Sequence, residues 1–169
     1  IIGCGHMAQV HIPYILKIKD AELVGFCDKN EIRSTELSEK YNIPFFTDTA
    51  KMLNDTKPDV VHILTPPKTH AEIAIQCLNF RCHVFVEKPL CLTLDDVDAI
   101  YKAAQLNDRI VGIDHNNLWS PLVQNALQIV QSEQIGSLIN IQYLLGDDFL
   151  EVVNKGYGRW ALDLRGGIF

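Results

Sequence analysis

The first 115 residues alternate short apolar segments with longer amphipathic ones. The short segments have strand length, whereas the longer ones repeat apolar residues at helical spacing. Strands or short extended segments are predicted at 1–2, 22–27, 44–47, 60–64, 83–86 and 109–113, and helices at 7–19, 31–41, 49–53, 69–80 and 94–106. This alternation predicts βαβ units, and therefore an α/β fold with a doubly wound, mostly parallel sheet of the Rossmann type.

The pattern changes after about residue 115. A helix is predicted over 121–132 and a longer strand over 138–145, and residues 146–169 are irregular with five glycines. We therefore expect a Rossmann domain over 1–115 and part of a second domain over 116–169. The chain begins inside a predicted strand at Ile1 and stops at Phe169 soon after two glycines, so we expect it to be truncated, more severely at its C-terminus.

Composition narrows the classes of function. The chain has 169 residues, of which 47% are apolar, so a sizeable core is available. It carries 15 Lys and Arg against 21 Asp and Glu, and it has no basic cluster, which argues against a nucleic-acid partner. No apolar run has the length of a membrane span and no signal peptide is visible, so we expect a cytoplasmic protein. The five cysteines form no CxxC pair, so we expect reduced thiols and no metal site.

A glycine-rich turn follows the first predicted strand. Residues 3–8, Gly-Cys-Gly-His-Met-Ala, fit the pattern GxGxxG/A. Gly3 allows the tight turn, Gly5 lets the backbone approach a pyrophosphate, and the small Ala8 lets the helix pack on the strand. The phosphates would then lie at the helix N-terminus beside His6 and Met7, where N–H groups and the helix dipole favour anions. An ordinary strand-to-helix turn is the alternative, because this pattern alone is weak.

Asp28 ends the second predicted strand, at about the distance where an acidic side chain binds the adenosine ribose hydroxyls. The alternative is that Asp28 caps the following helix. A carboxylate at this place would also repel a ribose 2′-phosphate. The sequence therefore predicts NAD as the cofactor, with NADP possible because Lys29 follows directly.

Two further segments lead to a family resemblance. Thr65-Pro66-Pro67-Lys68-Thr69-His70 follows one predicted strand, and Glu87-Lys88-Pro89 follows the next. GxGxxA, TPxxxH and EKP, in this order, resemble the glucose–fructose oxidoreductase and inositol dehydrogenase family (Gfo/Idh/MocA). The resemblance covers about the first 115 residues well. It implies a Rossmann domain followed by an α+β domain with an open, mainly antiparallel sheet. It also implies hydride transfer between a nicotinamide and a sugar, cyclitol or related hydroxyl substrate.

The resemblance assigns roles to the matching residues. Lys88 would be the catalytic lysine, and its bond to Pro89 is often cis in this family. A cation near the substrate hydroxyl lowers the cost of removing its proton, whereas a solvated loop lysine is the alternative. Glu87 would support the cofactor ribose or the geometry of Lys88. Thr65, Pro66 and Pro67 would form a loop under the dinucleotide. His70 would cap the next helix, contact the cofactor or have a structural role. No chemistry is assigned to His62, His83 and His115.

The chain departs from the family pattern after residue 113. Family members carry a segment like GFxxRFxP, whereas residues 114–121 read DHNNLWSP, with Leu118 at the arginine position. Asn116 and Asn117 could still hydrogen-bond the nicotinamide amide or substrate hydroxyls. Arg159-Trp160 and Gly166-Gly167 resemble the approach to a GGGxxxDxGxH segment whose Asp and His would lie beyond Phe169. We therefore expect this chain by itself to bind dinucleotide weakly and to catalyse nothing.

Three functions are consistent with these residues. The first is an NAD(P)-dependent dehydrogenase of a sugar-like substrate, and the second is a non-catalytic, dinucleotide-binding regulatory protein. The third is a reductase of another substrate, such as an imine or a tetrapyrrole. An intact Asp and His in the missing segment would favour an enzyme. The resemblance also implies a homo-oligomer formed through the sheet of the second domain.

Overall fold

The computed structural model describes residues 1–142 and divides them into two compact units, 1–114 and 115–142. The predictions for residues 143–169, including the end of the strand expected at 138–145, lie outside the described residues.

A parallel sheet forms the first unit. Strand β1 (Phe26–Cys27) pairs with β2 (Phe45–Phe46), and β4 (His83–Val86) lies between β3 (Val60–Ile63) and β5 (Val111–Ile113). Ile2 joins the two halves, because it forms parallel bridges to both Cys27 and Ile63. The resulting order is β2–β1–Ile2–β3–β4–β5. This order confirms the predicted Rossmann-like α/β fold, since the chain runs outwards from the centre first to one edge and then to the other.

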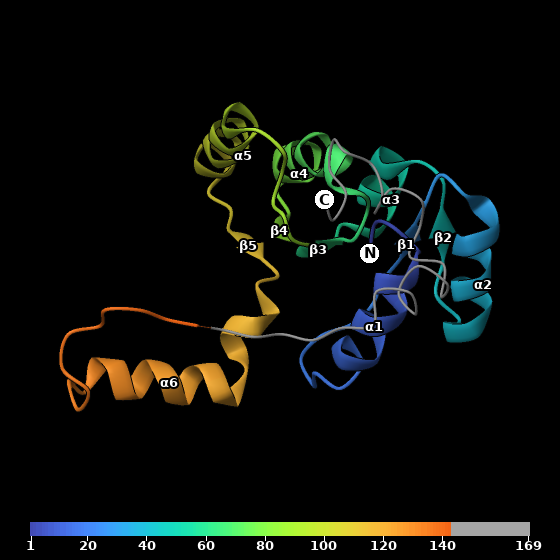
Figure 1. Ribbon diagram of the computed structural model, residues 1–169. Coiled ribbons are helices and arrows are strands. Elements are labelled where there is room, and N and C mark those ends of the chain that lie inside the picture. Colours follow the sequence, from blue (N-terminus) through green and yellow to red (C-terminus); the bar gives the residue numbers. More distant parts are fainter. Residues whose placement is uncertain (143–169) are drawn as a thin grey trace. The chain divides into compact units, whose positions relative to one another are not determined.

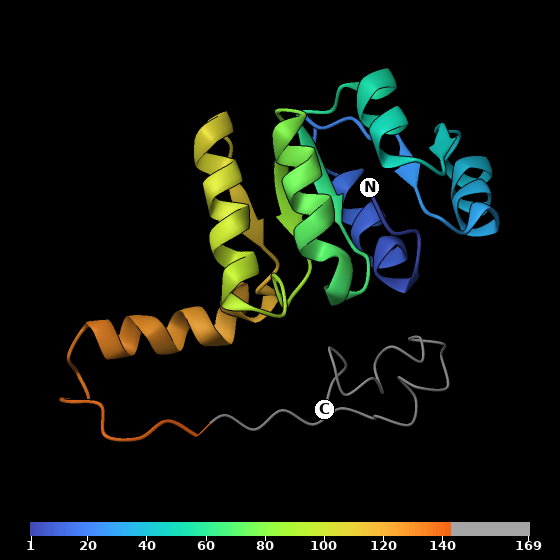
Figure 2. The same ribbon diagram turned by 90° about the horizontal axis from the view of Figure 1, so that it is seen from above.

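Helices cover both faces of the sheet, and each face has its own apolar core. Helices α3 (Thr49–Thr56), α4 (His70–Asn79) and α5 (Leu94–Asn107) pack on one face, where α4 and α5 lie side by side (Figure 2). Helices α1 (His6–Ile15) and α2 (Glu31–Tyr41) pack on the other face (Figure 1). Side chains alternate along each strand, so consecutive residues of β3 enter different layers.

Local sequence explains where several helices begin and end. The side chains of Asn30, Asp48 and Thr93 each accept a backbone N–H in the first turn of α2, α3 and α5. Such caps satisfy donors that have no partner inside the helix. Thr93 is thus the N-cap of α5, and the same three helices end at residues in the left-handed conformation.

Most predicted elements are present, but several boundaries were wrong. The helix predicted over 49–53 extends to Thr56, and the strand predicted over 109–113 begins at Val111. The strand predicted over 22–27 is reduced to Phe26–Cys27, because only this part has neighbours in the sheet, Ile2 and β2. The helix predicted over 7–19 ends at Ile15. Beyond it, Leu16 and Ile18 are more than half exposed, so continuing the helix would bury no further apolar surface.

The second unit contains the 3₁₀ helix η2 (Asn116–Trp119) and α6 (Pro121–Gln131). The strand predicted from residue 138 was wrong over 138–142, where these residues have no regular structure. A strand exists only when a neighbour completes its hydrogen bonds, and no strand among the described residues pairs with this segment. Within the described part of the chain, no helix is sufficiently long and apolar to cross a membrane.

Candidate active site

The glycine turn has the conformation that the motif predicts. Gly3 has φ +96°, and a Cβ atom there would lie 2.7 Å from the carbonyl carbon of Leu64. Gly5 precedes α1 and provides no side-chain cap, and a Cβ atom on it would meet nothing within 4 Å. Ala8 is fully buried in the core under α1. Gly3 and Ala8 therefore serve the packing of the turn, whereas the side of Gly5 is open to a ligand.

Asp28 lies beside this turn, directly after β1. Its Oδ2 accepts the backbone N–H of Cys4 at 2.8 Å, and its Oδ1 accepts that of Asn30 at 2.8 Å. The N-cap of α2 is Asn30, so Asp28 is not the helix cap that the alternative interpretation required. The carboxylate is thus held next to the glycine turn at the end of β1. An uncapped helix N-terminus, an open Gly5 and this carboxylate fit the phosphates and ribose of a dinucleotide.

The loop after β3 connects the glycine turn to the loop after β4. Gly3 packs against the backbone of Leu64 and Thr65. The ring of His70, which is 1% exposed, contacts the carbonyl oxygens of Thr65 and Pro89 at 2.6 and 2.9 Å. Both partners are acceptors, so a ring nitrogen that carries a hydrogen donates to the carbonyl that it faces. His70 therefore links the two loops from inside the domain.

Pro66 and Pro67 shape the loop after β3. Pro67 begins the 3₁₀ helix η1 (Pro67–Thr69) and is buried, whereas Pro66 is half-buried and its carbonyl accepts the hydroxyl of Thr69 at 2.9 Å. The same hydroxyl lies 2.9 Å from that of Thr65. These contacts hold the loop at the end of β3, beside the glycine turn.

Lys88 lies on the loop after β4. Its side chain is exposed, and the Lys88–Pro89 peptide bond is cis, as the resemblance led us to expect. Glu87 is only 7% exposed, and its Oε2 accepts the backbone N–H of Lys88 at 3.0 Å. The buried carboxylate thus holds the backbone from which the lysine side chain projects.

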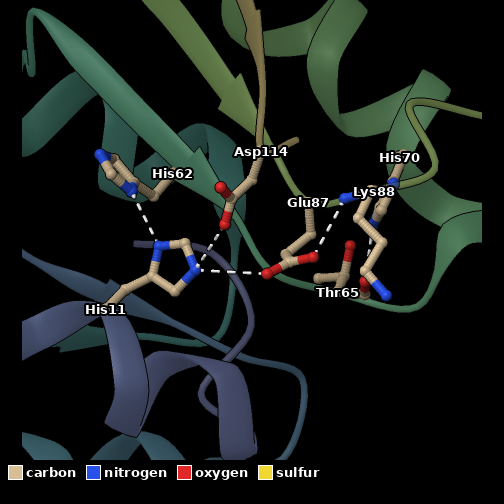
Figure 3. Close-up of polar contacts among 7 residues, drawn as sticks. All are labelled: His11, His62, Thr65, His70, Glu87, Lys88 and Asp114. Carbon is tan, nitrogen blue, oxygen red and sulfur yellow. Dashed lines mark hydrogen bonds and ion pairs between the residues drawn. The ribbon is translucent and has the colours of Figure 1, made fainter. Parts of the chain in front are cut away.

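Three residues to which the sequence analysis assigned no chemistry meet next to Glu87 (Figure 3). The Nε2 atom of His11 lies 3.3 Å from Glu87 Oε1 and 3.3 Å from Asp114 Oδ2. Its Nδ1 atom lies 3.5 Å from the Nδ1 atom of His62. One sequence signal could have indicated part of this cluster. His62 alternates with Val61 and Ile63, which face α4, so His62 had to face α1.

Burial and pairing shift the pKa values of this cluster. Burial alone would raise the pKa of Glu87, but the hydrogen bond and charge of His11, together with the Lys88 N–H, outweigh it. The pKa of Glu87 is therefore lowered from its usual value. Burial lowers the pKa of His62 to about 4, and the neighbouring His11 acts in the same direction. Glu87 is thus ionised and His62 is neutral at neutral pH.

The same cluster is the set of side chains in the described residues that could hold a metal ion. His11, Glu87 and Asp114 each offer one ligand atom, and these atoms lie within 4.8 Å of one another. A closed zinc site uses four protein ligands, whereas three is the number in an open site that also binds water. The contacts of the His11 ring with the two carboxylates account for the arrangement without a metal.

The predicted site residues therefore fall into two groups. All but one of them lie in the first unit, in the glycine turn and α1, at the end of β1, and in the loops after β3 and β4. They are Gly3, Gly5, His6, Met7, Ala8, Asp28, Thr65, Pro66, Pro67, His70, Glu87 and Lys88. Asn116 begins η2 in the second unit, so its contact with the nicotinamide stays a prediction.

A family model described as "Oxidoreductase family, NAD-binding Rossmann fold" matches residues 1–115, which hold the glycine turn, Asp28 and both loops. The chain belongs to the Gfo/Idh/MocA oxidoreductase family. The comparisons thus confirm the resemblance based on GxGxxA, TPxxxH and EKP.

Members of this family with assigned activities are similar to the chain. It is 30% identical over 137 residues to a myo-inositol 2-dehydrogenase from Thermotoga maritima, covering 80% of the chain and 41% of that protein. It is 31% identical over 140 residues to a D-glucoside 3-dehydrogenase from Escherichia coli, covering 82% of the chain and 40% of that protein. The chain thus spans about two fifths of the length of these relatives.

A solved relative contains ligands. The WlbA dehydrogenase from Bordetella pertussis, in complex with NADH and UDP-GlcNAcA, superposes with a TM-score of 0.77 at 25% identity. The match covers 80% of this chain and 39% of that one.

Proposed function

We propose that the protein to which this chain belongs is an NAD(P)-dependent oxidoreductase that moves a hydride between a nicotinamide and a sugar, cyclitol or related hydroxyl substrate. One observation carries the proposal. The glycine turn, the loop after β3 and the loop that bears Lys88 are joined to each other through the Gly3–Leu64 contact and the ring of His70. They lie at the carboxyl ends of adjacent parallel strands, where such sheets bind their ligands.

Each part of the site has a role in this reaction. The N-terminus of α1 and Gly5 would receive the pyrophosphate, and Asp28 would accept the adenosine ribose hydroxyls. When bound, the nicotinamide supplies the hydride acceptor or donor. The Lys88 ammonium would hold the substrate oxygen and stabilise it as its proton passes to a base, for which the resemblance implies the His of the segment beyond Phe169. Residue Asn116 would hydrogen-bond the nicotinamide amide or a substrate hydroxyl.

The relatives support the substrate class. They include dehydrogenases of myo-inositol and of D-glucosides, and the WlbA structure contains a nucleotide sugar. All of these names describe polyhydroxylated substrates. The Asp28 carboxylate favours NAD over NADP, because it would repel a 2′-phosphate.

The test is a substrate panel with the full-length gene product. Rates are measured for myo-inositol, scyllo-inositol, D-glucosides and UDP-sugars with NAD and with NADP, for the natural protein and for Lys88→Ala. We expect turnover with NAD, and we expect Lys88→Ala to lower kcat/KM by about 10² to 10⁴-fold. Lys102→Ala is the control, because Lys102 is exposed on α5.

Two results would count against the proposal. Full activity of Lys88→Ala would show that the lysine is not catalytic. Tight NADH binding without turnover of any polyol or sugar would instead favour a non-catalytic, dinucleotide-binding protein.

A further inference from the structure

We propose that His11 is a positioning residue for Lys88, acting through the Glu87 carboxylate. This inference rests on the catalytic role proposed above for Lys88. His11 Nε2 contacts Glu87 Oε1 at 3.3 Å, and Glu87 Oε2 accepts the Lys88 backbone N–H at 3.0 Å. The side chain of His11 on α1 is thus connected to the loop that bears Lys88 through the Glu87 carboxylate alone (Figure 3).

The backbone around Lys88 is held on both sides. On the downstream side, the carbonyl oxygen of Pro89 accepts a hydrogen bond from the buried ring of His70. On the upstream side, the Lys88 N–H is bound by Glu87. Residues from two helices therefore restrain this loop. His70 acts on it directly from α4, whereas His11 acts from α1 and needs Glu87 as an intermediary.

Glu87 alone would not hold this geometry. It is buried, and each of its carboxylate oxygens has a different partner, His11 on one side and Lys88 on the other. Without His11, one oxygen of a buried, ionised carboxylate would lose its donor, which is a costly state. The carboxylate would then turn towards another donor or take up a proton. Either change alters the acceptor that holds the Lys88 backbone.

The ring of His11 is itself oriented by neighbours on two strands. Asp114, which follows β5, places Oδ2 3.3 Å from His11 Nε2. His62 on β3 places its Nδ1 3.5 Å from His11 Nδ1, and the two rings meet edge to face with centroids 5.7 Å apart. The side chain of His11 is only 10% exposed. Its ring plane is therefore fixed by groups on both sides, as a positioning residue requires.

The experiment compares three variants of the full-length gene product, with NAD and the panel substrate that gives the highest rate. His11→Leu removes the donor, and His11→Gln retains one near the position of Nε2. His83→Leu is the matched control, since it removes a histidine whose Nδ1 accepts the Ile110 N–H at the other end of β4. NADH titration of each variant gives the dissociation constant and the fraction of competent sites.

We expect His11→Leu to lower kcat by about 10- to 100-fold per competent site, because small displacements of a catalytic group cost rate. The KM of the substrate and the Kd of NADH should each change by less than about threefold, since a positioning residue acts on the rate through Glu87 and not through a ligand contact of its own. His11→Gln should recover most of the lost kcat, and His83→Leu should lose none. If His11→Leu does not fold, His11→Asn replaces it with the same expectation, because its amide is too short to reach Glu87.

An unchanged kcat in His11→Leu, or a loss in His11→Gln equal to that in His11→Leu, would overturn the inference. Crystal structures of the variants provide a test that does not depend on activity. In His11→Leu the hydrogen bond from Lys88 N to Glu87 should be lost or displaced, and in His11→Gln it should remain. If His11→Leu retains that hydrogen bond, the role of His11 is wrong even when the panel yields no substrate. Absence of turnover in the natural protein would instead count against the proposed function.

Discussion

Gly3 and Leu64 approach each other so closely that no side chain fits between them. A Cβ atom on Gly3 would lie 2.7 Å from the carbonyl carbon of Leu64, and its φ of +96° is one that residues with side chains rarely adopt. This contact seats the turn after the first strand against the end of β3. Gly5, two residues later, faces open space instead. The two glycines of one motif therefore have different physical roles.

This difference predicts that alanine impairs stability at Gly3 and NADH binding at Gly5. Gly3→Ala should lower the free energy of unfolding by about 2 to 4 kcal/mol, from backbone strain and overpacking. Gly5→Ala should change it by less than about 0.5 kcal/mol, yet weaken NADH binding by about 10-fold or more, because its methyl group would occupy the place of the pyrophosphate. Urea denaturation and NADH titration measure the two effects. Equal loss of stability in both variants would contradict this division of roles.

Asp28 should set the preference between NAD and NADP. Replacing it with Ala removes the acceptor for the ribose hydroxyls and the source of repulsion towards a 2′-phosphate. We expect the Kd of NADH to rise by about 10- to 100-fold, and that of NADPH to change much less. Asp48→Ala is the control, since Asp48 caps α3 and should affect only stability. If the ratio of the NADH and NADPH Kd values were the same in Asp28→Ala as in the natural protein, Asp28 would not distinguish the two riboses.

His70 should matter for folding as well as for the site. His70→Leu would leave the carbonyl oxygens of Thr65 and Pro89 without their buried donor. We expect a loss of about 2 to 4 kcal/mol in the free energy of unfolding, measured by urea denaturation. His83→Leu should cost less than about 1 kcal/mol, because its hydrogen bond to Ile110 is exposed. If both variants lost the same amount, the two loops would not depend on His70.

His62 should make stability depend on pH. Its pKa falls from 6.5 in the unfolded chain to about 4 in the folded protein, so the folded state favours the neutral ring. This stabilisation is fully present above pH 6.5 and is lost as the pH falls from 6.5 towards 4, because the unfolded chain then binds a proton that the folded protein does not. The loss over this range is about 3 kcal/mol.

Replacing His62 with Leu should flatten this dependence between pH 6.5 and 5, as measured by urea denaturation at several pH values. The lowered pKa of Glu87 contributes only below its usual value of 4.5, so the two effects occur in different ranges. Parallel profiles of the natural protein and His62→Leu between pH 6.5 and 5 would assign the dependence to another group.

The sequence alone determined the alternation of strands and helices and the three motifs. Hydrophobic periodicity acts over a few residues, so α2 and β4 have the bounds that the pattern predicts. The glycine turn, the loop at Thr65 and the loop at Lys88 each follow a predicted strand, and parallel strands place their carboxyl ends together.

Only the tertiary structure decided which side chains meet. His11, His62, Glu87 and Asp114 are separated by between 25 and 103 positions in the chain, and no local pattern connects them. They converge because the sheet places the end of β4 between β3 and β5 while α1 crosses the face that His62 occupies. The length of β1 was decided in the same way, by the neighbours that complete its hydrogen bonds. Local sequence thus set the elements and motifs, whereas long-range packing determined which groups surround Lys88.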